Sequence, residues 1–312
     1  MSYTENRNIL QKADFALSHL VDNGGLLLPA QAQKFMRLSI VESTLLKQVT
    51  YRPMKRAEEK ISQIKFGSRV LRSAQELTPL GQADRVTPDI SEVKLHAQEL
   101  IAEIKVSDQV LEENLEQNTL RQTIMQLLAP ALGRDLEELV IKGDRSSADP
   151  FLAKFDGILA RAQSNVVDAA GAPISKDLLH SMMKALPARY RKDKRQLRFF
   201  CASDAELDYR NTLAERSTGV GDKYLETDTP VLAAGTPISG IPLFPDDQGA
   251  TSDQTSIILT HPKNIIVGVR RAIRIEWERN IRERGMTVVA TLEADSCYAE
   301  EPGVVKAINV QL

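Results

Sequence analysis

Cysteine and aromatic residues are scarce in this chain of 312 residues, which has two cysteines, one tryptophan, six tyrosines and eight phenylalanines. Cys201 and Cys297 stand far apart in the sequence. This spacing fits neither a disulfide framework nor a pair of zinc ligands. We therefore predict two reduced and buried thiols.

Long apolar runs are also missing. No uninterrupted stretch approaches the roughly 20 residues that cross a bilayer, and the start MSYTENRNILQKADF lacks the basic and apolar regions of a signal peptide. We expect a protein without a membrane partner that is made and used in the cytosol.

Signatures of catalysis are missing as well. The four histidines have no partner four residues away and no clustered cysteine. Ser203 and Ser217 lack a G-x-S-x-G context, and the GVG at residues 219–221 lacks the third glycine and the preceding strand of a dinucleotide loop. We predict no catalytic, cofactor-binding or metal-binding residues, and no enzyme activity.

Charge of one sign does not dominate either. The chain has 40 Lys and Arg and 42 Asp and Glu, which gives a net charge of −2. No overall positive field therefore favours a dedicated DNA-binding protein. The basic run at residues 189–198 is a local exception. It suggests a contact with nucleic acid, and a solvated helix end is the favoured alternative.

The patterns that are present indicate an α+β fold with two lobes. A short helix is expected over residues 6–21 and an arm entering a second helix through Phe35. Alternation predicts a strand at residues 61–66 and a half-buried strand at residues 93–106, with a bulge at Gln98 and Glu99. Between them, residues 67–91 hold few large apolar side chains, which favours a projecting arm.

The longest helix is expected over residues 119–142, where Thr119 and Gln122 have capping-box spacing and Pro130 predicts a bend. In the second lobe, Ser175 precedes a further helix as its N-cap, and another helix is expected at residues 204–213. Later strands are expected at LRFFCAS, SIILT, IIVGVRRAIRIEWE, MTVVATLEADSCYA and VVKAINV. We expect the last strands to complete the sheet of the first lobe.

The order of these elements resembles the major capsid proteins of tailed bacteriophages, a fold shared with encapsulin shells. The resemblance covers nearly the whole chain and rests on four stretches: GGLLLPAQAQKF at 24–35, EVKLHAQELIAEIKVSDQVLEEN at 92–114, LLAPALGRDLEELVIKGD at 127–144, and QLRFFCASDAELDYRNTL with GTPISGIPLFPDD. It implies an N-terminal arm (1–50), an extended β-hairpin loop (51–98), a peripheral domain with a long spine helix (99–169 and 263–312) and an axial domain (170–262).

The function implied by the resemblance is that of a virion protein that self-assembles into pentamers and hexamers of an icosahedral head enclosing double-stranded DNA. The alternative is an encapsulin-like compartment around a cargo enzyme, and an α+β enzyme is a more distant one. Expected partners are other copies, a separate scaffolding protein, a portal, possible decoration proteins and non-specifically packaged DNA, with assembly in the host cytoplasm.

Candidate assembly contacts lie in the arm and the extended loop. A planar guanidinium suits carboxylates across an interface, and a solvated charged loop is the alternative. The candidates are Phe35, Arg69, Arg72, Glu76, Asp84, Arg85 and Asp89. Cross-linked members of the family join a lysine of this loop to an asparagine of a neighbour. Residues 67–91 contain no lysine, so we predict a shell without isopeptide links.

Overall fold

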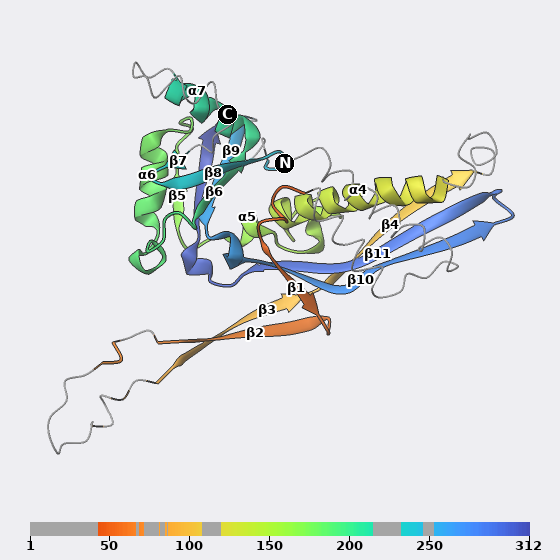
Figure 1. Ribbon diagram of the computed structural model, residues 1–312, viewed down its shortest axis with the longest axis horizontal. Coiled ribbons are helices and arrows are strands. Elements are labelled where there is room, and N and C mark those ends of the chain that lie inside the picture. Colours follow the sequence, from red (N-terminus) through yellow and green to blue (C-terminus); the bar gives the residue numbers. More distant parts are fainter. Residues whose placement is uncertain are drawn as a thin grey trace, which may run out of the picture.

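The computed structural model describes residues 43–66, 69–71, 81, 85, 87–107, 120–214, 232–245 and 253–312, without the side chains of residues 120–126 and 271–273. The expected α+β class is confirmed. Figure 1 shows a lobe around one sheet, an elongated body in which a long helix lies along a second sheet, and a two-stranded hairpin that projects from this body.

The elongated body is built on a four-stranded sheet in the order β1-β10-β11-β4. Its strands are β1 (Thr50–Met54), β10 (Ile265–Asn280), β11 (Gly285–Tyr298) and β4 (Gln98–Ser107). β1 is parallel to β10, with Thr50 opposite Ile266. β10 and β11 therefore complete a sheet begun near the start of the chain, as predicted, whereas the last expected strand, VVKAINV, joins the other sheet.

The long helix α4 (Leu120–Lys142) confirms the predicted longest helix and contains Pro130, whereas the capping box at Thr119 lies outside the described residues. Leu132 and Leu136 of α4 line a shared pocket with Leu100 and Ala102 of β4 and Leu292 of β11. One face of the four-stranded sheet is thus covered by the helix, which follows from the alternation of half-buried and exposed residues along β4.

The lobe is built on a six-stranded sheet in the order β5-β12-β9-β6-β8-β7. Its strands are β5 (Val166–Asp168), β12 (Val305–Gln311), β9 (Gln254–Thr260), β6 (Arg198–Ala202), β8 (Thr236–Ile241) and β7 (Leu232–Ala233). The sequence analysis grouped β5 and β12 with the peripheral part, yet both are hydrogen-bonded within this sheet. Partner choice between distant strands is not encoded in local periodicity.

Short helices flank the six-stranded sheet. α6 (Lys176–Ala185) begins at the predicted N-cap, where the Ser175 side chain accepts a hydrogen bond from the Leu178 N–H. α7 (Ser203–Ala214) confirms the helix expected after β6. The remaining short helical segments are η2 (Leu152–Lys154), α5 (Ile158–Arg161), η3 (Ala188–Tyr190), η4 (Pro262–Asn264) and η5 (Glu301–Gly303).

The projecting hairpin consists of β2 (Glu58–Lys65) and β3 (Asp89–His96), paired antiparallel from Glu58 with His96 to Lys65 with Asp89. The bulge predicted at Gln98 and Glu99 is wrong. β3 ends at His96 and pairs with β2, whereas β4 starts at Gln98 and pairs with β11 without a register shift. The break in alternation marks a change of partner at Ala97.

The buried apolar side chains form one main cluster that joins the lobe to the body, and a second under the hairpin made of Met54, Ile61, Leu95, Ala97, Ile266 and Cys297. Cys201 and Cys297 are both free and buried, as predicted. The expected helix at residues 6–21 lies outside the described residues.

Candidate assembly surface

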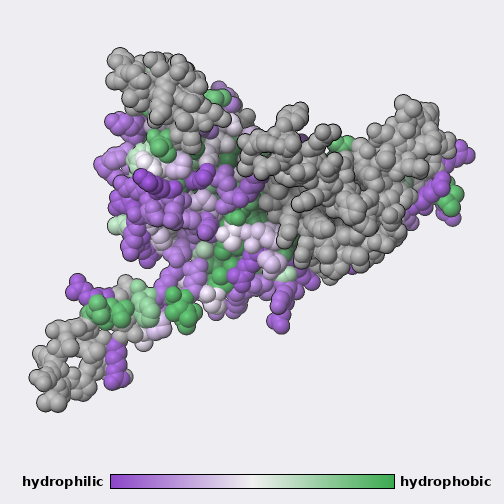
Figure 2. Space-filling model, viewed as in Figure 1, coloured by the Kyte–Doolittle hydropathy of each residue, from purple (hydrophilic) through white to green (hydrophobic). Residues whose placement is uncertain are grey.

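The hairpin carries large apolar side chains that are exposed to solvent. Ile64 on β2 is 68% exposed and stands opposite Ile90 on β3, which is 60% exposed. Phe66, Val70 and Leu71 follow along the chain and are also exposed. We call Ile64, Phe66, Val70, Leu71 and Ile90 the hairpin patch, and Figure 2 shows hydrophobic atoms on this projecting part. A contiguous apolar patch of this kind is typical of a protein–protein contact.

Alternation along β2 explains why the hairpin has both a buried and an exposed apolar side. Ile61 and Ile64 are three residues apart, so in a strand they point to opposite faces. Ile61 packs in the cluster under the hairpin and Ile64 faces water. The sequence analysis counted both as strand residues. Their odd spacing is the signal that could have identified the patch.

The assembly candidates predicted from the sequence lie only partly within the described residues. Arg69, Arg85 and Asp89 are exposed, and Asp89 ends the hairpin pairing opposite Lys65. Phe35, Arg72, Glu76 and Asp84 lie outside the described residues. Their expected contacts with a neighbouring copy stay predictions.

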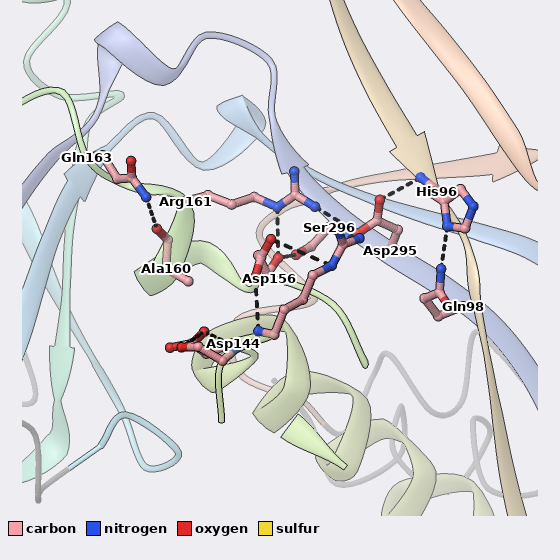
Figure 3. A network of polar contacts seen from close by, with 11 residues as sticks. His96, Gln98, Asp144, Asp156, Ala160, Arg161, Gln163, Asp295 and Ser296 are labelled. Atoms are coloured by element: carbon pink, nitrogen blue, oxygen red, sulfur yellow. Dashed lines mark hydrogen bonds and ion pairs between the residues drawn. The ribbon is translucent and has the colours of Figure 1, made fainter. Parts of the chain in front are cut away.

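A buried carboxylate fixes the base of the hairpin. The Asp295 side chain on β11 is 1% exposed. It accepts hydrogen bonds from the His96 N–H at 2.7 Å and from the Ser296 N–H at 2.8 Å. Arg161 of α5 places Nη2 3.1 Å from Asp295 Oδ1. Figure 3 shows these groups converging where β3 gives way to β4.

The electrostatics of Asp295 reflect two opposing effects. Burial raises the pKa of this carboxyl, and the His96 N–H and the Arg161 guanidinium oppose that rise. Arg161 also donates from Nε to the Asp156 carbonyl oxygen at 2.8 Å. One arginine thus ties α5, the segment before it and β11 together at the point from which the hairpin leaves.

Two glycines bring the end of α4 against the segment that leads to Arg161. The Gly157 N–H donates to the Gly143 carbonyl oxygen at 2.8 Å. A Cβ at Gly143 would lie 2.4 Å from the Phe155 carbonyl oxygen, and one at Gly157 would lie 2.6 Å from that of Val140. Only glycine permits this approach, which positions Asp156 and Arg161 for their contacts with β11.

A second set of contacts holds the far end of the paired strands β2 and β3, at Gln63 and Lys65. Gln63 donates from Nε2 to the Ala299 carbonyl oxygen at 3.0 Å, and Lys65 Nζ lies 3.3 Å from Glu300 Oε1. The Tyr190 hydroxyl donates to Glu300 Oε2 at 2.5 Å. Asn264 brackets the Glu300 backbone with two hydrogen bonds, of 2.7 and 2.9 Å.

The pKa values at this contact follow from its geometry. Burial would raise the pKa of Glu300, but the hydrogen bonds from Tyr190 and Lys65 outweigh it and lower that pKa. Burial and the neighbouring carboxylate raise the pKa of Tyr190 to about 12. At neutral pH, Glu300 is therefore charged and Tyr190 keeps its proton, so the contact to Lys65 is an ion pair.

No group of three or more His, Cys, Asp or Glu in the described part of the chain could hold a metal ion. No helix among the described residues is long and apolar enough to cross a membrane. The surface that stands out is the hairpin patch, on a hairpin that is held at its base and at the far end of its paired strands.

Comparison with known proteins agrees with this geometry. The phage capsid family matches residues 23–294. A protein of Bacillus subtilis (strain 168) named YqbE, described as a prophage capsid protein, is 37% identical over 310 residues, which cover 98% of this chain and 99% of YqbE.

Solved structures share the fold at low sequence identity. The capsid of a native GTA particle has a TM-score of 0.64 at 16% identity, covering 86% of this chain and 90% of that one. The satellite phage P4 procapsid has a TM-score of 0.61 at 12% identity, covering 90% and 99%. The SrpI encapsulin of Synechococcus elongatus PCC 7942 has a TM-score of 0.58 at 12% identity, covering 86% and 87%. From its family match and its close relative, the chain belongs to the phage capsid family, as a structural capsid protein of phage or prophage type.

Proposed function

We propose that copies of this chain form the pentamers and hexamers of a closed icosahedral head that encloses double-stranded DNA. The observation that carries the proposal is the hairpin patch, which projects from the body and exposes five large apolar side chains. Each such side chain contributes about 1.5–3 kcal/mol when it is fully buried. An isolated subunit cannot gain this energy, whereas a neighbouring copy can supply the burial.

The anchorage of the hairpin supports the proposal. A docking element must be presented at a defined angle, because ordering a free segment on binding costs free energy. Asp295 holds the base of the hairpin through the His96 N–H, and Glu300 holds the far end of its paired strands through Lys65. The patch is therefore pre-organised for a neighbour.

The finer organisation is proposed on the same basis. Residues 1–50 form the N-terminal arm, residues 51–98 the extended loop, and residues 99–169 and 263–312 the peripheral domain, apart from β5 and β12. Residues 170–262 form the axial domain, whose sheet includes β5 and β12. Phe35, Arg69, Arg72, Glu76, Asp84, Arg85 and Asp89 contact neighbouring copies. A separate scaffolding protein, a portal and decoration proteins are the further partners, and the head assembles in the host cytoplasm before it becomes part of the virion.

Electron microscopy of the purified protein tests the role of the hairpin patch. The double substitution Ile64→Ser and Ile90→Ser should abolish shells and leave soluble subunits, because it removes apolar surface from the docking face. The matched control, Ile64→Val and Ile90→Val, keeps that face apolar and should still assemble. Both positions are exposed, so stability should change by less than about 0.5 kcal/mol. Normal shells from the serine variant would refute the proposal.

Two further measurements refine it. Charge reversal at Arg69 and Arg72 should lower particle yield if both dock on a neighbour, whereas an unchanged yield would leave them as solvated charges. The content of native particles separates the two shell functions. DNA inside supports the phage head, and a cargo protein without DNA would favour the encapsulin-like compartment, whose fold is also similar.

A further inference from the structure

Positive charge is concentrated at one end of the six-stranded sheet. Residues 189–198, here called the basic segment, connect η3 to β6 and contain six cationic side chains and one acidic one. The cationic residues are Arg189, Arg191, Lys192, Lys194, Arg195 and Arg198. The whole chain carries a net charge of only −2, so this cluster is a local feature and not part of a general excess.

The cations of the basic segment differ in their surroundings. Arg198 is half-buried and donates to the Ser239 hydroxyl at 3.2 Å, and Arg189 lies over the Tyr190 ring at 4.6 Å from its centre. Lys192, Lys194 and Arg195 are exposed. No ion pair within 4.0 Å joins these three to an acidic residue of the described chain, as is also true of exposed lysines elsewhere such as Lys55 and Lys94, so what sets the segment apart is the number of cations in ten residues.

A further cation joins the basic segment from η4. The His261 ring lies 3.1 Å from Gln196 Oε1, and the Lys263 N–H donates to the same ring. Lys263 is exposed and forms no ion pair with a described residue. The single acid of the segment, Asp193, accepts a hydrogen bond from Gln196 Nε2 at 2.7 Å. At least four exposed cations therefore share one surface.

The chemistry of this surface selects among anionic partners. Protein interfaces bury apolar side chains at their centre, yet among the described residues no large apolar side chain between Val166 and Leu207 is exposed. Single-stranded nucleic acids stack on aromatic rings, and the aromatic residue here, Tyr190, is tied to Glu300 and Arg189. What remains is a set of point charges suited to the phosphates of a duplex.

We propose that the basic segment, together with Lys263, binds the phosphate backbone of double-stranded DNA without sequence preference. The inference rests on the proposed function, because a filled head supplies the duplex. It goes further by assigning the contact to one end of the six-stranded sheet, through Lys192, Lys194, Arg195 and Lys263.

Binding of the purified full-length protein to a fluorescent duplex tests the inference. Anisotropy is measured between about 50 and 200 mM salt, where log K falls linearly with log salt. The triple substitution Lys192→Gln, Lys194→Gln and Arg195→Gln should reduce the salt slope by roughly 3, about one for each phosphate contact. Affinity near 100 mM salt should fall at least tenfold, equally for duplexes of different sequence.

A matched triple removes the same charge elsewhere. Lys105, Arg282 and Arg284 lie at the far end of β4 and in the β10–β11 turn and are exposed. Their change to Gln should leave duplex affinity within about threefold, since the contacts, and not the net charge, set the slope. Equal losses in both triples, or no loss in the first, would overturn the inference.

Two further measurements test for an acidic protein as the partner and distinguish failure of this inference from failure of the proposed function. Polyglutamate that binds as tightly as the duplex and depends on the same three cations would indicate an acidic protein instead, and overturn the inference. The first triple should still form normal shells by electron microscopy. Absence of shells from the wild-type protein would defeat the proposed function alone, whereas normal shells with unchanged DNA binding in the triple would defeat only this inference.

Discussion

Arg161 and Asp295 form an ion pair whose acid is 1% exposed and whose base is 25% exposed. Removing the arginine would leave a buried carboxylate without its counter-charge. We expect Arg161→Met to lower the free energy of unfolding by about 3–5 kcal/mol, measured by urea denaturation of unassembled subunits. The loss should appear together with faster hydrogen exchange at His96, whose N–H shares the same carboxylate.

Arg145 provides the control for this prediction. Its side chain is 53% exposed and lies 3.8 Å from Asp156, so the pair is screened by water. Arg145→Met should change stability by less than about 1 kcal/mol. Equal losses from the two substitutions would show that burial of Asp295 does not govern the contribution of this network.

The two cysteines allow a second test with single residues. Burial raises the pKa of Cys297 to about 12 and that of Cys201 further. The thiolate is the reactive form, so neither thiol should react with a disulfide reagent at pH 8 in the folded protein. Both should react in denaturant. Rapid labelling of the native subunit would contradict the burial of these side chains.

At the scale of elements, the ion pair between Lys65 and Glu300 should stabilise the position of the hairpin. Glu300→Gln keeps an acceptor for Tyr190 and removes the charge, so hydrogen exchange in β2 and β3 should become faster. The matched control is Glu92→Gln, which removes the exposed pair with Lys60 inside the hairpin. It should leave exchange nearly unchanged.

The pH dependence of this contact has a defined sign. The folded pKa of Glu300 lies below its ordinary value of 4.5. Its contribution is therefore complete above that value and is lost as pH falls through the lower folded pKa. Protection factors in the wild-type hairpin, which are corrected for the slower intrinsic exchange in acid, should fall as pH is lowered and approach those of Glu300→Gln. A wild-type hairpin that stays equally protected in acid would argue against the ion pair.

The elements with strong local signals could be predicted from the sequence, because their causes are local. The cap at Ser175, the helix α4 and the strand alternation in β11 depend on neighbouring residues. The break after His96 was visible but its meaning was not. A bulge and a change of partner disturb alternation in the same way, and only the position of β11 distinguishes them.

At the scale of the whole molecule, the apolar hairpin patch adds to the charged assembly candidates, which stay predictions. The sequence analysis named charged residues of the loop, whereas the structure exposes the apolar residues Ile64, Phe66 and Ile90. Exposure of an apolar residue depends on whether another part of the chain covers it. The network of Arg161, Asp295 and His96 was missed for the same reason, since its members are distant in sequence.

Covalent linkage of the shell gives a further test at this scale. Residues 67–91 lack lysine, and the nearest lysine, Lys65, is bonded to Glu300. We expect assembled particles that are boiled in detergent to release only monomers on a gel. The control is the same sample before boiling, in which the particles should still have the mass of an assembled shell. A ladder of covalent multimers after boiling would refute the prediction.

The pairing of β1 with β10 and of β4 with β11 has a consequence for quality control. These strands flank the hairpin in sequence, and their partners come from much later in the chain. Folding that depends on such distant pairings is slow. We therefore expect the hairpin to reach its final position only in a subunit that has finished folding, so that an unfinished copy would lack the shape needed to join a growing head.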